Sequence, residues 1–126
     1  MAPDRSPLSR GELDVARLLW GLKSATVREV HAALPDDRPL DFSTVQTYLR
    51  RLEAKGYVTS VLEGRTRVYR PRIRPKTVIR ETVDDLVERL FGGESLPLMR
   101  HLIEDRGLSD EDLAELRRLL EKRDDS

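Results

Sequence analysis

The chain has no cysteine, and aromatic residues make up only 5% of it. Without cysteine, neither a disulfide framework nor a thiolate metal site can form. No apolar run approaches the roughly 20 residues that span a bilayer, and the start of the chain lacks the apolar stretch of a signal peptide. We therefore expect a cytoplasmic protein that does not insert into a membrane.

The residue patterns of common catalytic sites are also missing. There is no Gly-rich phosphate loop and no HExxH pair, and the serines occur at helix starts without a nearby histidine. Acidic pairs such as Asp84 and Asp85 are more simply explained as helix-surface or helix-start residues. His31 and His101 have no ligand spacing between them. We expect no enzyme activity, no metal and no cofactor.

Charged residues are abundant, at 37%, and unevenly distributed. Residues 1–75 hold 14 Lys and Arg against 9 Asp and Glu, a net +5, whereas residues 76–126 hold 9 against 14, a net −5. This asymmetry predicts a basic part that meets an acidic partner and a second part with a different role. Chance variation in a charge-rich chain is the alternative.

Three helical patterns occupy the basic part. Capping boxes, in which Ser9 pairs with Glu12 and Thr26 with Glu29, begin the first two. A third helix begins with Ser43 as its cap and ends at Gly56. Apolar residues recur at helical spacing in the first two helices: Leu13, Ala16, Leu19 and Trp20, then Val27, Val30 and Leu34.

The segment YVTSVLEGRTRVYRP, residues 57–71, changes to a strand pattern. β-Branched and aromatic residues lie on both sides of Glu63 and Gly64, which predicts two strands joined by a tight turn. Three helices followed by a basic hairpin predict a winged helix-turn-helix in a mainly α fold. The expected organisation is a flexible terminus over residues 1–7, a winged domain over 8–75 and a helical domain over 76–123.

The third helix has two different faces. Val45, Leu49 and Leu52 fall on an apolar face, and no acidic residue precedes Glu53 on the opposite one. Hydroxyl, amide and guanidinium groups suit base edges and phosphates in a DNA major groove, and the helix start can present backbone N–H groups to a phosphate. An ordinary solvated face is the alternative. The candidate groove-reading residues are Ser43, Thr44, Gln46, Thr47, Arg50 and Arg51.

In the hairpin, Arg65 and Arg67 are two residues apart and are predicted to share a strand face along the phosphate backbone. Protection of a strand edge by charge is the alternative explanation for them. A winged domain could instead serve as a protein-interaction module. That function would favour apolar or aromatic groups on the outward face of the third helix, where this chain has Thr47 and Arg50.

The acidic part contains three amphipathic helical segments and no strand pattern. Such a thin layer buries little by itself, so we expect it to pack against a second copy and form a homodimer. Packing against the winged domain is the alternative. The candidate dimerisation residues are Ile79, Val83, Leu86, Leu90, Leu98, Leu102, Leu113, Leu116 and Leu120.

Several segments, in this order, resemble the penicillinase-repressor family of bacterial transcription regulators. They are LSRGELDVARLLW, TVREVHAALP, FSTVQTYLRRLEAKGYV, EGRTRVYRP and LVERLFGG, and the resemblance covers residues 8–121. It implies a homodimeric repressor that binds a palindromic double-stranded DNA operator through its winged helix and dimerises through its C-terminal helices.

The resemblance also implies a regulatory partner, a membrane sensor-protease that triggers derepression. In the antibiotic-resistance branch, derepression is associated with cleavage at an Asn-Phe pair, and this chain has His101-Leu102 at that place. The copper-responsive branch has a cysteine cluster near its C-terminus, which this chain lacks. Thiolate copper sensing is therefore excluded.

Overall fold

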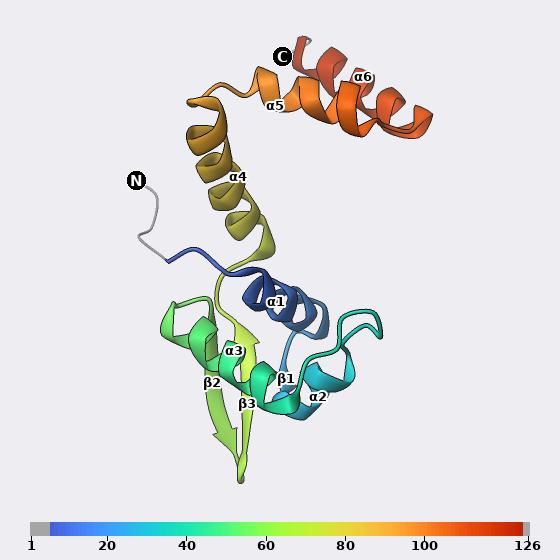
Figure 1. Cartoon of the computed structure of the whole chain (residues 1–126). Coiled ribbons are helices and arrows are strands. Elements are labelled where there is room, and N and C mark those ends of the chain that lie inside the picture. The colour runs from blue at the N-terminus through green and yellow to red at the C-terminus, as the bar shows by residue number, and fades with distance from the viewer. Residues whose placement is uncertain (1–5, 125–126) are drawn as a thin grey trace. The chain divides into compact units, whose positions relative to one another are not determined.

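A computed structural model describes residues 6–124 and shows helices with one small sheet (Figure 1). The chain divides into two compact units, residues 1–82 and 83–126. We call them the winged-helix unit and the C-terminal unit. The elements are α1 (Arg10–Leu22), β1 (Ala25–Thr26), α2 (Val27–Ala32), α3 (Phe42–Ala54), β2 (Val58–Glu63), β3 (Thr66–Pro71), α4 (Pro75–Phe91), α5 (Leu96–His101), the π-helix η1 (Leu102–Arg106) and α6 (Asp110–Asp124).

Both predicted capping boxes are confirmed. At the start of α1, the Ser9 hydroxyl accepts from Glu12 N at 3.2 Å, and Glu12 Oε1 accepts from Ser9 N at 2.8 Å. Thr26 and Glu29 form the same reciprocal pair at the start of α2. These bonds satisfy N–H groups that the first helical turn leaves without partners, so the sequence fixes where both helices begin.

The start of α3 was predicted wrongly. Its N-cap is Asp41, which is extended and whose carbonyl accepts from Thr44 N and Val45 N, so Ser43 lies inside the first turn. No side-chain hydrogen bond caps this start, so the backbone conformation of Asp41 defines the N-cap. Because the Thr44 amide is used in this way, it is not one of the free N–H groups expected at the start of the helix.

The end of α3 was predicted correctly at Gly56. This glycine has φ +87°, and its amide donates to Glu53 O, while Tyr57 N donates to Leu52 O. This pair of bonds is the Schellman arrangement, which needs a left-handed residue at the position of Gly56. The chain therefore turns sharply from α3 into β2.

The sheet has three antiparallel strands in the order β1-β3-β2, where the sequence predicted only a hairpin. Strand β1 consists of two residues, Ala25 opposite Tyr69 and Thr26 opposite Val68, and was missed because it is too short to show a period of two. The core between helices and sheet consists of Val15, Ala16, Leu19, Ala25, Val30, Val45, Leu49, Leu52, Tyr57, Val58, Tyr69 and Val78.

The hairpin turn lies one residue later than predicted. Glu63 pairs with Thr66, which leaves Gly64 and Arg65 as the two turn residues. Gly64 has φ +66°, which suits glycine at the first central position of a tight hairpin turn. Arg65 therefore belongs to the turn, and the prediction that it shares a strand face with Arg67 was wrong.

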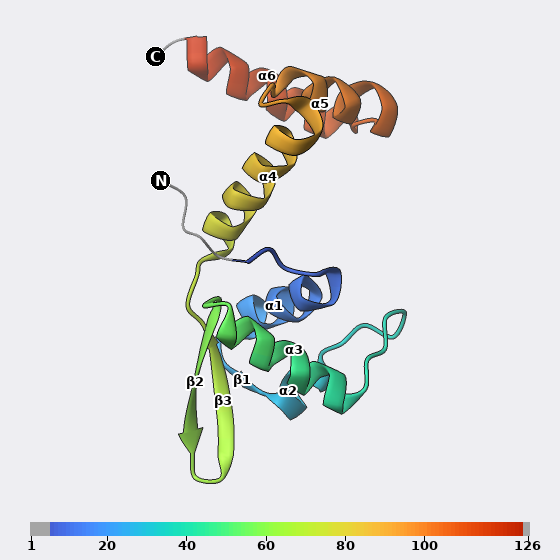
Figure 2. The same ribbon diagram turned by 60° about the vertical axis from the view of Figure 1, so that its left-hand side comes forward.

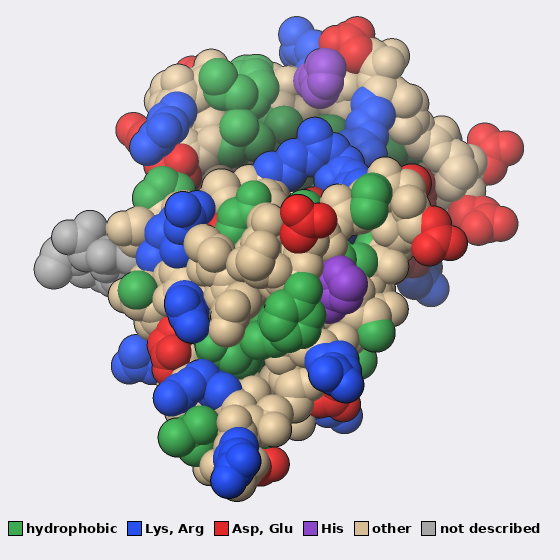
Figure 3. Space-filling model, turned by 60° about the horizontal axis from the view of Figure 1, so that its bottom comes forward, with side chains coloured by type: hydrophobic (Ala, Val, Ile, Leu, Met, Phe, Trp, Pro, Cys, Tyr) green, Lys and Arg blue, Asp and Glu red, His purple; other side chains and the backbone are tan. Residues whose placement is uncertain are grey.

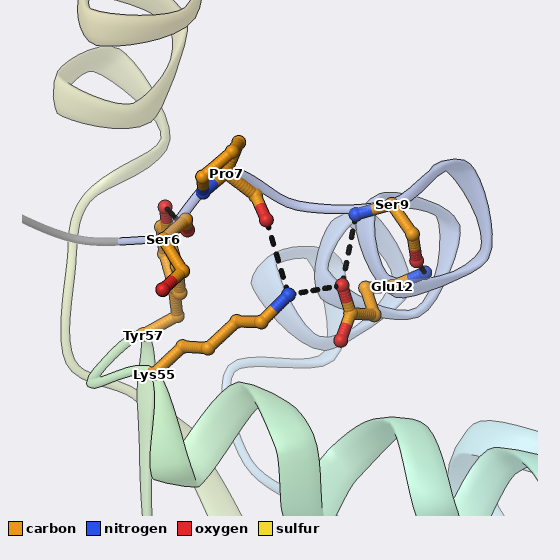
Figure 4. Close-up of polar contacts among 6 residues, drawn as sticks. All are labelled: Ser6, Pro7, Ser9, Glu12, Lys55 and Tyr57. Carbon is orange, nitrogen blue, oxygen red and sulfur yellow. Dashed lines mark hydrogen bonds and ion pairs between the residues drawn. The ribbon is translucent and has the colours of Figure 1, made fainter.

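A partly buried polar cluster fastens the first described residues to the body of the winged-helix unit (Figure 4). Lys55 Nζ donates to Glu12 Oε1 at 2.7 Å and to Pro7 O at 3.0 Å, and the Tyr57 hydroxyl donates to Ser6 O at 2.8 Å. The terminus that we expected to be flexible extends over residues 1–7. Residues 1–5 lie outside the described part, and the carbonyl groups of Ser6 and Pro7 accept these hydrogen bonds.

The C-terminal unit contains the second half of α4 together with α5, η1 and α6. Helix α4 ends at Phe91 and is followed by Gly92 and Gly93, with φ values of +60° and +87°. The Ser109 hydroxyl accepts from Asp112 N at 3.0 Å and so caps the start of α6. Helices α5 and α6 lie side by side in both ribbon views (Figures 1 and 2), but among described residues 83–124 only Val87 is buried.

Candidate nucleic-acid interface

Helix α3 separates a buried face from an exposed one. Val45, Leu49 and Leu52 are each 0% exposed, so α3 is firmly seated in the core of the winged-helix unit. The polar side chains lie on its other faces. Ser43, Thr47, Arg50 and Arg51 are exposed, whereas Thr44 and Gln46 are half-buried. The structure thus presents the six candidate residues on one helix whose orientation the core fixes.

The polar groups of α3 differ in how far they are already engaged. The Thr47 hydroxyl donates to Ser43 O at 3.0 Å, so its hydrogen is used within the helix. Its methyl group remains suited to apolar contact with a thymine. The side chains of Arg50 and Arg51 form no hydrogen bond or ion pair with another described residue. Their guanidinium groups are therefore available for base edges or phosphates.

The hairpin of β2 and β3, residues 58–71, is the wing, and its arginines lie in three different settings. Arg65 is exposed in the turn, and Arg70 lies 3.7 Å from Glu63 in an exposed pair at the edge of the hairpin. Arg67 donates through Nη1 to the Ser60 hydroxyl at 2.9 Å, and that hydroxyl donates to Glu53 of α3 at 2.6 Å. Arg67 is therefore held toward α3.

A groove runs between the start of α2, the first half of α3 and the wing. Figure 3 views the molecule from below and shows Lys and Arg side chains on this face, with hydrophobic side chains between them. Four arginines line the groove, which brings together residues from the two predicted sets. The groove is lined by Thr26, Val27, Arg28, Phe42, Gln46, Arg50, Leu62, Arg65, Thr66, Arg67 and Tyr69.

Sequence reasoning missed seven of these eleven lining residues, and Arg28, Phe42 and Leu62 are the most informative of them. Arg28 lies at the start of α2, and its position beside the wing depends on the tertiary fold. Phe42 and Leu62 are large apolar residues that remain 46% and 61% exposed. Phe42 stands one residue after the N-cap of α3, and that signal was lost when Ser43 was taken as the cap.

The Tyr69 phenol reports how charges are arranged at the base of this groove. Burial raises the pKa of Tyr69 above its usual value, and the Glu53 carboxylate raises it further. Arg67 and Arg50 act in the opposite direction on the same pKa. The phenol therefore stays neutral at physiological pH, and charged residues of both α3 and β3 influence the pKa of this buried group.

Both histidines are engaged in local contacts. His31 Nε2 lies 3.0 Å from Leu40 O, and its ring packs edge-on against Phe42. His101 Nδ1 lies 3.0 Å from Asp105 Oδ2 in the next turn. No cluster of His, Asp or Glu that could hold a metal ion occurs among residues 6–124. Over the same residues, no helix combines the length and apolar character needed to cross a membrane.

Comparison with known proteins places this geometry in a family. The family model described as penicillinase repressor matches residues 8–122. The protein belongs to the penicillinase repressor family. This membership makes it a DNA-binding transcriptional repressor.

Individual relatives agree with this membership. The chain is 30% identical over 115 residues to a penicillinase repressor of Bacillus licheniformis, covering 91% of this chain and 90% of the relative. It is 34% identical over 114 residues to the transcriptional regulator BlaI of Mycobacterium tuberculosis, covering 87% and 81%. The solved DNA-binding domain of the repressor BlaI is 32% identical, with a TM-score of 0.50, covering 61% of this chain and 90% of that domain.

Proposed function

We propose that the protein acts as a homodimer that binds a two-fold symmetric DNA operator and represses transcription from it. One observation supports this most directly. The three inward residues of α3 are fully buried, and its outward side faces a groove that Arg28, Arg50, Arg65 and Arg67 help to line. In this arrangement α3 enters the major groove, and the wing follows the phosphate backbone.

The proposal divides the contacts between bases and backbone. Gln46 can pair with adenine N6 and N7, and Arg50 with guanine O6 and N7. Ser43, Thr44 and Arg51 are assigned to phosphates or flanking bases, and Thr47 to a thymine methyl group. At the wing, the exposed turn residue Arg65 and the held residue Arg67 are assigned to phosphates on the same strand of DNA.

Support for the homodimer comes from apolar side chains that the single chain leaves exposed. Exposed fractions are 58% for Ile79, 41% for Val83, 39% for Leu86, 68% for Leu90 and 64% for Leu120. The other four candidates, Leu98, Leu102, Leu113 and Leu116, are half-buried. A second copy supplies an identical surface, and two copies on a two-fold axis match two half-sites of an operator.

Two further partners and properties belong to the proposal. Repression takes place in the cytoplasm without catalysis, because the protein acts by occupying DNA. The family resemblance adds a membrane sensor-protease as the trigger of derepression. His101 and Leu102 mark the change from α5 to η1, so a protease would meet this bond inside helical structure. Detection of a fragment ending at His101 in derepressed cells would establish cleavage there, and intact chain in such cells would exclude it.

The experiment that tests the function is selection of genomic fragments by the purified full-length protein at physiological salt, followed by footprinting. Enrichment of a few fragments with two protected half-sites on related helical faces is expected. Uniform retention of all fragments, with a steep dependence on salt, would contradict sequence-specific repression. That second result would favour a winged domain that docks on another protein.

A further inference from the structure

The Ser60 hydroxyl connects the wing to α3. It donates to Glu53 Oε2 at 2.6 Å and accepts from Arg67 Nη1 at 2.9 Å. A serine hydroxyl has a single hydrogen, so these contacts have one direction, from Arg67 through Ser60 to Glu53. Three elements, β3, β2 and α3, are joined by this chain of bonds.

Glu53 is an unexpected residue at a DNA-binding surface. It is the only acidic residue of α3, and it is exposed. A carboxylate that faces DNA repels phosphates and weakens binding unless it does something else. Here the Glu53 carboxylate accepts the hydrogen bond from the Ser60 hydroxyl. The lone pairs of that hydroxyl are then available to accept from Arg67.

The contact with Ser60 orders the Arg67 side chain before DNA binds. An arginine side chain loses much rotamer freedom when a contact immobilises it, and that loss weakens binding. The contact with Ser60 uses one N–H of Nη1, and a guanidinium has five. Four donors therefore remain for phosphate oxygens, from a side chain that is already ordered.

The two other arginines of the hairpin lack this support. Arg65 lies in the turn and has no hydrogen bond or ion pair with another described residue. Arg70 has only the 3.7 Å pair with Glu63, in which both side chains are more than half exposed. Among the described arginines of the wing, Arg67 alone combines a position in the groove with a fixed orientation toward α3.

We infer that Ser60 and Glu53 are positioning residues, which hold the Arg67 guanidinium in the groove for a DNA phosphate. The inference rests on the proposed function and adds a coupling between wing and recognition helix. The affinity for DNA therefore also depends on Ser60 and Glu53, although neither residue needs to contact the DNA.

The test compares Ser60→Ala, Arg67→Ala and the double variant for binding to a labelled duplex of the sequence protected in the footprint. Ser60→Ala is expected to weaken binding about tenfold, because two copies each lose one ordered side chain. The salt slope should stay unchanged, since Arg67 still reaches its phosphate in the complex. Arg67→Ala should weaken binding and lower the slope by about 2, one contact in each copy.

The double variant provides the decisive comparison, because Ser60 is argued to act only through Arg67. It should bind as Arg67→Ala does. Thr59→Ala is the matched control, because Thr59 is the exposed neighbour of Ser60 on β2 and faces the other side of the hairpin. It should bind as the wild type does.

Three results would overturn the inference while leaving the repressor function intact. These are wild-type affinity of Ser60→Ala, a further loss when Ser60→Ala is added to Arg67→Ala, or wild-type affinity and slope of Arg67→Ala. If the wild-type protein retained all genomic fragments alike, the proposed function would fail first, and the inference would fall with it.

Discussion

Glu12 Oε1 and Lys55 Nζ lie 2.7 Å apart, so an ion pair joins the start of α1 to the end of α3 (Figure 4). The side chain of Glu12 is 2% exposed and that of Lys55 is 26% exposed. Burial alone would raise the pKa of Glu12. The hydrogen bonds from Lys55 and Ser9 outweigh burial, and the pKa lies below its usual value. The carboxylate therefore stays charged inside the protein and helps to set the position of α3.

Removing the cation should destabilise the fold. Lys55→Met leaves a buried carboxylate without its charged partner, and we expect the free energy of unfolding to fall by about 2–3 kcal/mol at pH 7. Urea denaturation followed by Trp20 fluorescence measures it. Arg38→Met is the control, because it breaks an exposed pair with Asp14 at 3.1 Å and should cost at most about 0.5 kcal/mol. Equal losses in both variants would contradict the importance of the buried pair.

The same carboxylate makes stability depend on pH in a defined direction. A carboxyl group whose pKa is lower in the folded state contributes its full stabilisation above its unfolded pKa, about 4.3 for glutamate. That contribution is lost as the pH falls from there through the folded pKa of Glu12. In Glu12→Gln, the part of the acid sensitivity that Glu12 causes should disappear. Urea midpoints measured at intervals from pH 7 to pH 3, for wild type and variant, would show parallel curves if Glu12 played no part.

The Tyr48 ring lies so close to Gly11 that we expect no larger residue to fit at position 11 without moving the ring. A Cβ added at Gly11 would lie 2.6 Å from Tyr48 Cε2, whereas at Gly21 it would meet nothing within 4 Å. Both glycines lie in α1, where alanine is preferred by about 1 kcal/mol. Gly21→Ala should therefore raise the free energy of unfolding by about 0.5–1 kcal/mol. Gly11→Ala should not raise it, because the ring must move.

Removing the ring separates this explanation from any other role of Gly11. Adding Gly11→Ala to Tyr48→Ala should stabilise that variant by about the amount that Gly21→Ala provides. Urea denaturation of the four variants measures these differences. A gain from Gly11→Ala in the wild-type background, equal to that of Gly21→Ala, would show that Tyr48 tolerates a side chain there.

The sequence was most informative where local chemistry decides the structure. Ser9 and Thr26 fixed the starts of α1 and α2, and Gly56 fixed the end of α3, because a cap depends on residues three or four apart. The inward face of α3 was equally predictable from its period. The cap of α3 was predicted wrongly, because Asp41 occupies the N-cap without a side-chain hydrogen bond and so leaves no capping pattern in the sequence.

Features that depend on tertiary contacts could not be predicted in this way. The two-residue strand β1 exists only because β3 lies beside it. The burial of Glu12 depends on Lys55, 43 positions further along the chain. The contact of Arg67 with α3 through Ser60 likewise requires the register of the hairpin, in which a shift of one residue would turn Arg67 to the other face.

The recognition-helix assignment predicts a specific loss in the double variant Arg50→Ala, Arg51→Ala. Its affinity for the protected sequence should fall at least about a hundredfold, because each copy loses two charge-assisted contacts. The slope of log K against log salt should also decrease, since fewer counterions are released. Fluorescence anisotropy with a labelled duplex at several salt concentrations measures both quantities.

A matched pair of arginines outside the groove provides the control for this charge change. Arg100 and Arg117 are exposed residues of the C-terminal unit, and replacing both by alanine removes the same charge. That variant should keep its affinity within about threefold. Circular dichroism and sedimentation should show folded protein of unchanged mass in both cases. Unaltered binding by the Arg50, Arg51 variant would remove α3 from the DNA interface.

Leu90 provides the most direct test of the dimer. It is 68% exposed on α4, and burying a leucine against a second copy contributes about 1.5–3 kcal/mol. Leu90→Glu should raise the dimer dissociation constant by a factor of about 10 to 100 or more, because a carboxylate would have to be buried in each copy. Leu22→Glu, at a residue 41% exposed on α1, makes the same chemical change outside the proposed interface and should leave the mass unchanged. Sedimentation velocity over a range of concentrations distinguishes the two variants.

Operator affinity should fall together with dimerisation, because a monomer occupies one half-site and loses the effective concentration that links the second. A Leu90→Glu protein that stays dimeric would place the interface elsewhere, and one that becomes monomeric but binds the full operator undiminished would show that repression does not need the dimer.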